Sequence, residues 1–341
     1  MYQALYRKWR PKVFSDVIGQ EHITETLKKQ VAEGRTSHAY LFTGTRGTGK
    51  TTCAKILAKA VNCEHPVHGD PCCQCPSCLG LESGSFLDVL ELDAASNNGV
   101  DQVRALRDEA IYAPANVKKR VYIVDEVHML STAAFNALLK ILEEPPAHLM
   151  FILATTELHK VPATILSRCQ RYSFKRILPK DIAQRLTYVA GQEHIDLTAD
   201  GAELLSRLAD GALRDGLSLL DQCAAAGGTV DSRAVLEVLG LAGNLQTAQL
   251  MRHILDRNAQ AALLLLNELY AGGKDVGAVL GELSTLTRDL LLRKTAPEGG
   301  AALLSGGFDS ATLDQLGKDV PSNRFLYLAS TLQKAAADLY Y

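Results

Sequence analysis

A glycine-rich loop between residues 44 and 51 carries the residue types that bind a polyphosphate. It matches the pattern G-x-x-x-x-G-K-[ST] and reads Gly44-Thr45-Arg46-Gly47-Thr48-Gly49-Lys50-Thr51. The glycines let the backbone curl so that its N–H groups face phosphate oxygens. Lys50 can reach the β- and γ-phosphates of a nucleotide, and the Thr51 hydroxyl can ligate Mg²⁺. An apolar run before the loop and a helical pattern after it complete the context of a nucleoside triphosphate site.

Two adjacent carboxylates follow a second apolar run. Val121–Val124 predicts a buried strand, and Asp125 and Glu126 come directly after it. Ligands of α/β folds bind at the carboxyl ends of the parallel strands, so both carboxylates are expected beside the phosphate loop. We expect Asp125 to hold Mg²⁺ through water and Glu126 to act as the general base that polarises the attacking water. A protein that only binds the nucleotide has little need of Glu126, so the pair predicts hydrolysis.

Three further residues fit roles at the γ-phosphate. Thr156, with Thr155 as a near alternative, ends the next predicted strand and could hold the attacking water. Arg168 lies beyond that strand, so we expect it to serve the nucleotide of a neighbouring subunit, with an ordinary surface arginine as the competing interpretation. Arg214 begins a later helix and could reach the γ-phosphate. A cation is mildly unfavourable at the start of a helix because of the helix dipole, and this slightly favours a functional role. Contact with the γ-phosphate would couple nucleotide state to the angle between domains; a solvated arginine is again the alternative.

Four cysteines in the pattern C-x8-C-x2-C-x2-C predict a metal site. The four ligands, inserted after the phosphate-loop helix, are Cys63, Cys72, Cys75 and Cys78. Thiolates at this spacing converge on tetrahedral Zn²⁺, whereas an iron–sulfur run would need a following C-x3-C-P element that is missing. No open coordination position is indicated, so the zinc is predicted to be structural. The adjacent Cys73 is expected to be a spectator, and His65 and His68 are possible substitute ligands.

Short apolar runs alternate with helical patterns through the first half of the chain, which predicts an α/β fold with a largely parallel sheet. The predicted strands are Ala39–Thr43, Phe86–Leu92, Val121–Val124, Met150–Ala154 and Arg171–Phe174. The predicted helices between them are His22–Glu33, Thr51–Val61, Val100–Tyr112 and Thr132–Leu142.

Only helical patterns follow Pro179. The first cluster contains short helices, predicted at Asp181–Gln192, Gly201–Ala209, Leu213–Ala225 and Ser232–Leu239. The second contains longer ones, predicted at Gln246–Asp256, Ala259–Tyr270, Val276–Leu292 and Arg324–Leu339. The chain therefore divides into an α/β part and two all-α parts.

The composition sets further bounds on the protein. Hydrophobic residues make up 47% of the 341 residues, yet no apolar stretch reaches eighteen residues, so we expect no membrane span. The basic N-terminus lacks the apolar core of a secretory signal, which predicts a cytoplasmic protein. The net charge of −2 argues against a generally basic nucleic-acid binder, so any such contact is expected to be local or shared with partners.

Together these motifs resemble the gamma/tau family of bacterial DNA polymerase III clamp-loader subunits, which are AAA+ ATPases. The N-terminal part of the resemblance lies in Tyr6-Arg7-Lys8-Trp9-Arg10-Pro11, in Phe14 and in Val17-Ile18-Gly19-Gln20-Glu21-His22. The rest lies in the phosphate loop, the four cysteines, Asp125-Glu126-Val127-His128-Met129-Leu130 and Ile165-Leu166-Ser167-Arg168-Cys169. Beyond about residue 240 the similarity is mainly one of helical character.

The resemblance implies a domain order and roles for single residues. It implies an AAA+ nucleotide-binding domain at 1–178 with a zinc module at 62–80, an all-α lid domain at 179–242 and an all-α collar domain at 243–341. One collar helix and all later domains are expected to be missing. Asp125 and Glu126 would form the Walker B pair, and Thr156, Arg168 and Arg214 would be sensor 1, the trans-acting finger and sensor 2. The nucleotide contacts would extend to Thr52, and the adenine would pack on Arg7, Pro11, Val17 and Ile18.

The implied function is that of an ATP-hydrolysing clamp-loader subunit of the DNA-directed DNA polymerase holoenzyme. It would use ATP, Mg²⁺ and structural Zn²⁺ to open the sliding clamp and load it onto primed DNA during replication. Its partners would be delta- and delta-prime-type subunits, further copies of itself in a five-subunit ring, the clamp and primed DNA. One alternative is another AAA+ DNA motor, such as a branch-migration helicase subunit, against which the zinc insertion and the collar argue. The other is a ring scaffold that does not hydrolyse ATP, against which Lys50, Thr51 and Glu126 argue.

Overall fold

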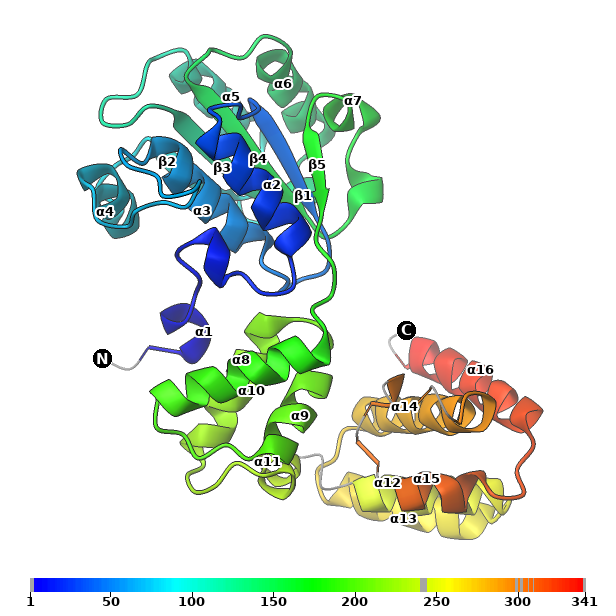
Figure 1. Cartoon of the computed structure of the whole chain (residues 1–341). Helices are drawn as coiled ribbons and strands as arrows, with labels where there is room; N and C mark the ends of the chain where they lie inside the picture. The colour runs from blue at the N-terminus through cyan, green and yellow to red at the C-terminus, as the bar shows by residue number, and fades with distance from the viewer. Residues whose placement is uncertain are drawn as a thin grey trace. The chain divides into compact units, whose positions relative to one another are not determined.

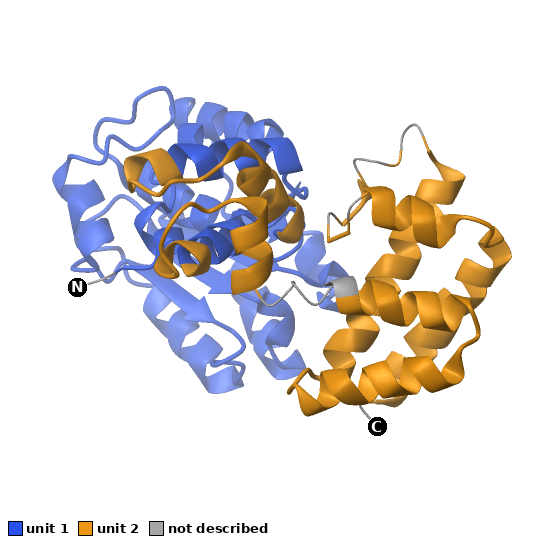
Figure 2. Cartoon of the chain, turned by 90° about the horizontal axis from the view of Figure 1, so that it is seen from below, with its two compact units in different colours: residues 1–189, 209–221 blue, residues 190–208, 222–341 orange. Residues whose placement is uncertain are grey.

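The computed structural model describes residues 3–239, 244–297, 300, 303–305, 307–308 and 310–339. The chain forms two compact units, each with its own apolar core. The first unit consists of Met1–Val189 and Ala209–Asp221, and the second of Ala190–Leu208 and Gln222–Tyr341; Figure 2 colours them separately. The domain boundary predicted at 242/243 lies outside the described residues.

A five-stranded parallel sheet forms the centre of the first unit, as predicted. Its spatial order is β2-β3-β4-β1-β5. The strands are β1 (Ala39–Thr43), β2 (Val89–Asp93), β3 (Arg120–Asp125), β4 (Leu149–Thr155) and β5 (Gln170–Ser173). Because all neighbouring strands run parallel, the segments that follow β1, β3 and β4 emerge at the same edge of the sheet. The phosphate loop follows β1, and the two carboxylates and the threonine pair stand at the ends of β3 and β4.

Helices cover both faces of the sheet, so the strands are buried on two sides and read as continuous apolar runs. Tyr40 and Phe42 of β1 share a core with α2 (Glu21–Ala32) and α3 (Lys50–Asn62). Leu41, which points to the opposite face, shares a core with α5 (Val100–Ala110), α6 (Thr132–Glu143) and α7 (Ala163–Leu166). The two helical layers are visible in Figure 1.

The structure corrects some of the predicted ends. β2 begins at Val89 rather than Phe86, because the Phe86 ring packs on Gly80, where an added Cβ would lie 2.6 Å from the ring. α5 ends at Ala110 rather than Tyr112, shortly before Pro114, which disfavours helix in the residue before it. Among the described residues, four short α-helices were not predicted: α1 (Leu5–Lys8), α4 (Pro76–Ser83), α7 and α15 (Ser310–Gly317).

The predicted helices after β5 are confirmed, with small shifts of their ends. They are α8 (Pro179–Gln192), α9 (Ala199–Leu208), α10 (Leu213–Ala225), α11 (Ser232–Val238), α12 (Asn244–Leu255), α13 (Ala259–Ala271), α14 (Val276–Thr295) and α16 (Ser322–Asp338). α12 to α16 enclose one core, in which Met251, Leu286 and Phe325 are fully buried. Among the described residues no helix has both the length and the apolar character needed to cross a membrane.

Candidate active site

The phosphate loop connects β1 to α3 at the carboxyl edge of the sheet. Gly44, Gly47 and Gly49 have φ angles of +141°, +77° and +104°, which residues with a side chain rarely adopt. A Cβ on Gly44 would lie 2.4 Å from the carbonyl oxygen of Phe174, and one on Gly47 would lie 2.6 Å from the Cβ of Ala212. The loop therefore needs glycine at these positions, and it leaves the N-terminus of α3 open to an anion.

The loop lines a cavity of about 810 Å³ within the first unit, a volume suited to a nucleotide. The predicted site residues that line it are Arg7, Pro11, Val17, Ile18, Arg46, Gly47, Thr48, Gly49, Lys50, Thr51, Thr52, Asp125, Glu126 and Arg214. The lining residues that sequence reasoning missed as site residues are Tyr6, Trp9, Arg10, Asp93, Ala95, Ile177, Leu213 and Leu217. Two signals could have found some of them. Tyr6, Trp9 and Arg10 surround Arg7 in one motif, and Asp93 ends β2 as Asp125 ends β3.

Lys50 is a buried ammonium held inside the loop. Its Nζ donates hydrogen bonds of 2.8 Å to the carbonyl oxygens of Gly44 and Thr45. These two predicted site residues are absent from the cavity lining, and they contact Lys50 instead. Burial lowers the pKa of Lys50, and the nearby carboxylates of Glu126 and Asp125 oppose this change. A phosphate oxygen could take over the bonds that the two carbonyl groups now accept.

The two predicted magnesium ligands are in direct contact. The Thr51 Oγ1 donates a hydrogen bond of 2.6 Å to Oδ2 of Asp125. The other carboxylate oxygen of Asp125 accepts the backbone N–H of Glu126 at 2.9 Å. A hydroxyl and a carboxylate beside a phosphate-binding loop are hard oxygen donors, which is the ligand class that Mg²⁺ prefers. The donor set therefore fits the ion.

Glu126 is oriented by residues from two elements. Its φ of +47° is unusual for a non-glycine residue. Its Oε2 accepts a hydrogen bond of 3.1 Å from the Thr156 Oγ1 and lies 3.4 Å from Nδ1 of His128. The Thr155 side chain is fully buried and points elsewhere, with its Oγ1 3.0 Å from the same His128 nitrogen. Of the two candidate threonines, Thr156 is the one that contacts the carboxylate.

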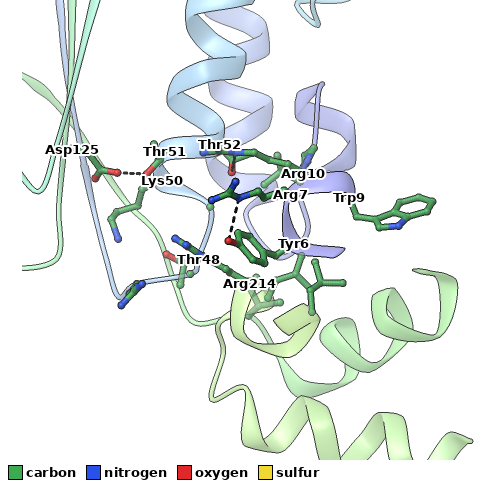
Figure 3. A pocket seen from close by; sticks show the side chains of 18 of the residues that line it. Tyr6, Arg7, Trp9, Arg10, Thr48, Lys50, Thr51, Thr52, Asp125 and Arg214 are labelled. Carbon is green, nitrogen blue, oxygen red and sulfur yellow. Dashed lines mark hydrogen bonds between the residues drawn. The ribbon is translucent and has the colours of Figure 1, made fainter. Parts of the chain in front are cut away.

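Three arginines that line the cavity are held by neighbouring side chains, and two of them contact Tyr6. The Arg214 guanidinium lies over the Tyr6 ring, 4.9 Å from its centroid. Nε of Arg7 donates a hydrogen bond of 3.2 Å to the Tyr6 hydroxyl and lowers the pKa of Tyr6. Nε of Arg10 donates a hydrogen bond of 3.1 Å to Oγ1 of Thr52. Figure 3 shows these side chains beside the phosphate loop. The cavity therefore offers several cations to a polyphosphate.

Arg168 does not line this cavity. Its Nη2 lies 2.7 Å from Oε1 of Glu143, and its Nη1 donates a hydrogen bond of 2.8 Å to the Thr164 carbonyl oxygen. The side chain is one-third exposed, at 33%. The structure thus separates this arginine from the nucleotide cavity of its own chain.

The four predicted metal ligands converge in space. The sulfurs of Cys63, Cys72, Cys75 and Cys78 all lie within 4.8 Å of one another. Tetrahedral Zn²⁺ with Zn–S bonds of about 2.3 Å places sulfurs roughly 3.8 Å apart, and two of the observed S···S distances are 4.0 Å. Backbone N–H groups of Gln74 and Cys75 lower the pKa of Cys72 to about 6, whereas burial raises the pKa of Cys63 and of Cys78.

Neighbouring side chains stay outside this cluster. The Cys73 thiol is directed to the Lys12 carbonyl oxygen, 3.8 Å away, and neither His65 nor His68 joins the four sulfurs. The short helix α4 begins inside the cluster, where the Cys75 sulfur accepts the N–H of Cys78 and Pro76 takes the first helical position. The donor set therefore fits a four-sulfur zinc site.

Three family models match successive parts of the chain. "DNA polymerase III, delta subunit" matches residues 19–177. "DNA polymerase III clamp loader subunit, ATPase lid domain" matches residues 181–229, and "DNA polymerase III subunits gamma and tau domain III" matches residues 230–339.

Curated relatives match nearly the whole chain. It is 47% identical over 339 residues to DNA polymerase III subunit tau of Bacillus subtilis, which covers 99% of this chain and 60% of the relative. Identity to subunit tau of Salmonella typhimurium is 44%, covering 100% of this chain and 51% of the relative. Identity to subunit gamma of Buchnera aphidicola is 41%, covering 83% of this chain and 78% of the relative. The chain thus spans about half to three-fifths of the two tau subunits.

Solved structures share the fold. The RuvB Holliday junction branch migration motor of Thermotoga maritima superimposes with a TM-score of 0.52, covering 78% of this chain and 86% of that chain. Because the sequence identity is 16%, this comparison shows a similarity of fold alone.

Proposed function

Because the chain belongs to the gamma/tau family of DNA polymerase III subunits, we propose that it is an ATP-hydrolysing subunit of a clamp loader. The observation that carries the proposal is the assembly of Lys50, Thr51, Asp125 and Glu126 in one cavity. A phosphate loop alone would serve binding, whereas the second carboxylate beside it serves hydrolysis. ATP binding would open the sliding clamp, and hydrolysis would release the clamp on primed DNA.

The predicted site residues have separate tasks in this proposal. The loop N–H groups and Lys50 bind the phosphates, and Glu126 accepts a proton from the attacking water while Thr156 orients it. Thr51 and Asp125 would hold Mg²⁺, which neutralises charge on the β- and γ-phosphates. Arg214 would turn from Tyr6 towards the γ-phosphate. The adenine would pack on the wall that Arg7, Pro11, Val17 and Ile18 contribute.

Arg168 and the helical parts point to an assembly. Since Arg168 lies outside its own cavity, we assign it to the nucleotide of an adjacent subunit, as an arginine finger. The partners would be delta- and delta-prime-type subunits, further copies of this chain in a five-subunit ring, the clamp and primed DNA. The matches to the lid and domain III models support a lid followed by a collar, although these models meet at 229/230. We place the nucleotide-binding domain at 1–178, the lid at 179–242 and the collar at 243–341. A bacterial replication subunit acts in the cytoplasm, where we place it.

The proposal also includes a structural zinc ion. The four cysteine sulfurs would hold one Zn²⁺ with no free coordination position, so its role is structural. The zinc module would span 62–80, between the phosphate-loop helix and β2.

The proposal is tested by the ATPase rate of the complete loader with clamp, primed DNA or both. We expect strong stimulation only when both are present. Stimulation by duplex DNA without clamp would favour the second candidate function, that of a branch-migration motor. The RuvB motor of Thermotoga maritima shares the fold of this chain. Lys50→Ala should abolish the activity. The matched control is Lys55→Ala, on the same helix, because Lys55 pairs with Glu91 outside the cavity.

A further inference from the structure

One N-terminal segment, residues 9–18, lines the cavity at both of its ends. Trp9, Arg10 and Pro11 line it at one end, and Val17 and Ile18 line it at the other. The residues between them, 12–16, do not line the cavity. Lys12, Phe14 and Ser15 contact the region from Cys63 to Ser83, which we call the cysteine module. The segment that forms this wall of the cavity therefore contacts the cysteine module through its central residues.

Asp70 of the cysteine module makes the central contact. Its Oδ1 accepts the backbone N–H of Phe14 at 2.6 Å, and its Oδ2 accepts the hydroxyl of Ser15 at 2.6 Å. Nζ of Lys28 lies 3.6 Å from the same carboxylate and donates a hydrogen bond of 3.3 Å to Ser15. The Asp70 side chain is only 13% exposed, so these charge-assisted bonds are partly shielded from water.

The position of Asp70 is set by a tight turn of the module. Val67 and Asp70 exchange backbone hydrogen bonds of 2.8 and 2.9 Å around His68 and Gly69, whose φ angles are +50° and +87°. Positive φ at both central residues is the geometry of a two-residue hairpin turn. A Cβ on Gly69 would lie 2.1 Å from the Lys28 carbonyl oxygen, so glycine alone allows the turn to approach α2 this closely.

A second contact ties the module to the same segment. Nζ of Lys12 lies 2.6 Å from a carboxylate oxygen of Glu82, and Lys59 of α3 lies 3.1 Å from the other oxygen. On the other side, the Phe14 side chain is fully buried and shares a core with Val17, which lines the cavity. A shift of Phe14 would therefore be passed to the cavity wall.

We propose that the cysteine module is a clasp for the nucleotide-binding wall, with Asp70 as its positioning residue. The folded state of the metal site would then set the affinity for ATP, although none of its cysteines lines the cavity. The inference rests on the proposed function in one respect, namely that the ligand is ATP.

The test compares Asp70→Asn with Glu64→Gln in the full chain. Glu64 belongs to the same module, but its carboxylate accepts hydrogen bonds from Ser77 inside the module. Both variants lose one negative charge without losing volume. The readouts are the Kd of a fluorescent ATP analogue, the KM and kcat for ATP, amide hydrogen exchange of residues 9–18 and zinc content.

We expect Asp70→Asn to raise the Kd and the KM about tenfold, the effect of one lost charge-assisted hydrogen bond, with kcat and zinc content unchanged. The Phe14 amide should exchange faster. Glu64→Gln should leave all four readouts near the wild type, and removal of zinc from the wild type should raise the Kd as Asp70→Asn does.

Two results would overturn the inference. One is a Kd for Asp70→Asn equal to that of Glu64→Gln while the wild type binds the analogue. The other is a higher Kd without faster exchange in residues 9–18. Failure of the wild type itself to bind the analogue would instead refute the proposed function, and the exchange data would still show whether the clasp holds.

Discussion

The hydroxyl of Thr156 donates a hydrogen bond of 3.1 Å to the carboxylate of Glu126. Glu126 follows β3 and Thr156 follows β4, and these strands are neighbours in the sheet. The bond joins the proposed general base to the residue proposed to sense the γ-phosphate. A nucleotide that engaged Thr156 would change the environment of Glu126, so in the proposed mechanism recognition and hydrolysis would share one contact.

Replacing each threonine by valine separates two roles. Thr156→Val should lower kcat and leave the Kd for ATP near its wild-type value, because it removes the hydroxyl that contacts Glu126. Thr155→Val should instead lower the melting temperature, since it removes one hydrogen-bond partner of the buried His128 side chain. Steady-state kinetics and thermal unfolding of both variants check this. The reverse pattern would assign the sensor role to Thr155.

Glu126→Gln should bind ATP but hydrolyse it about 10²–10⁴-fold more slowly, because glutamine cannot accept the proton from the attacking water. Nucleotide binding by fluorescence and single-turnover hydrolysis are the measurements. Glu157→Gln is the matched control, because Glu157 lies nearby but does not line the cavity. Hydrolysis at the wild-type rate in Glu126→Gln would contradict the general-base role.

Arg168→Ala should leave ATP binding by the isolated chain unchanged and abolish clamp- and DNA-stimulated hydrolysis in the assembled ring. The reason is that the side chain contacts Glu143 rather than its own cavity. Arg171→Ala, an exposed arginine of β5, is the control. The trans assignment fails if the isolated wild-type chain hydrolyses ATP as fast as the ring does.

Elemental analysis should find about one zinc per chain, because four thiolates complete a tetrahedral site. Cys72→Ser should lose the metal, since it removes one of the four sulfurs. Cys73→Ser, the adjacent control, should retain it because its thiol lies outside the cluster. Iron in place of zinc, or a metal-free chain with intact cysteines, would refute the assignment.

The fold was predictable where the pattern is local. All five strands and most helices appear in the sequence as short apolar runs or amphipathic periods, since burial acts on neighbouring residues. The errors lie where packing overrides the pattern. Phe86 looks like the start of a strand, but its ring packs on Gly80, which has no side chain to exclude it. α4 was missed because Pro76 and the closely spaced cysteines around it suggest turns.

The site was predictable only in part. Short and recognisable spacings mark the phosphate loop, the Asp125-Glu126 pair and the four cysteines. The sequence by itself was therefore enough to predict these residues. The tertiary structure decided which distant residues meet: Asp70 with Phe14, Arg214 with Tyr6, and Thr156 with Glu126. These contacts depend on strand order and on how helices and loops pack, which no short spacing encodes. Tertiary packing also accounts for the position of Arg168. Its guanidinium lies beside the carboxylate of Glu143 rather than in the cavity of its own chain.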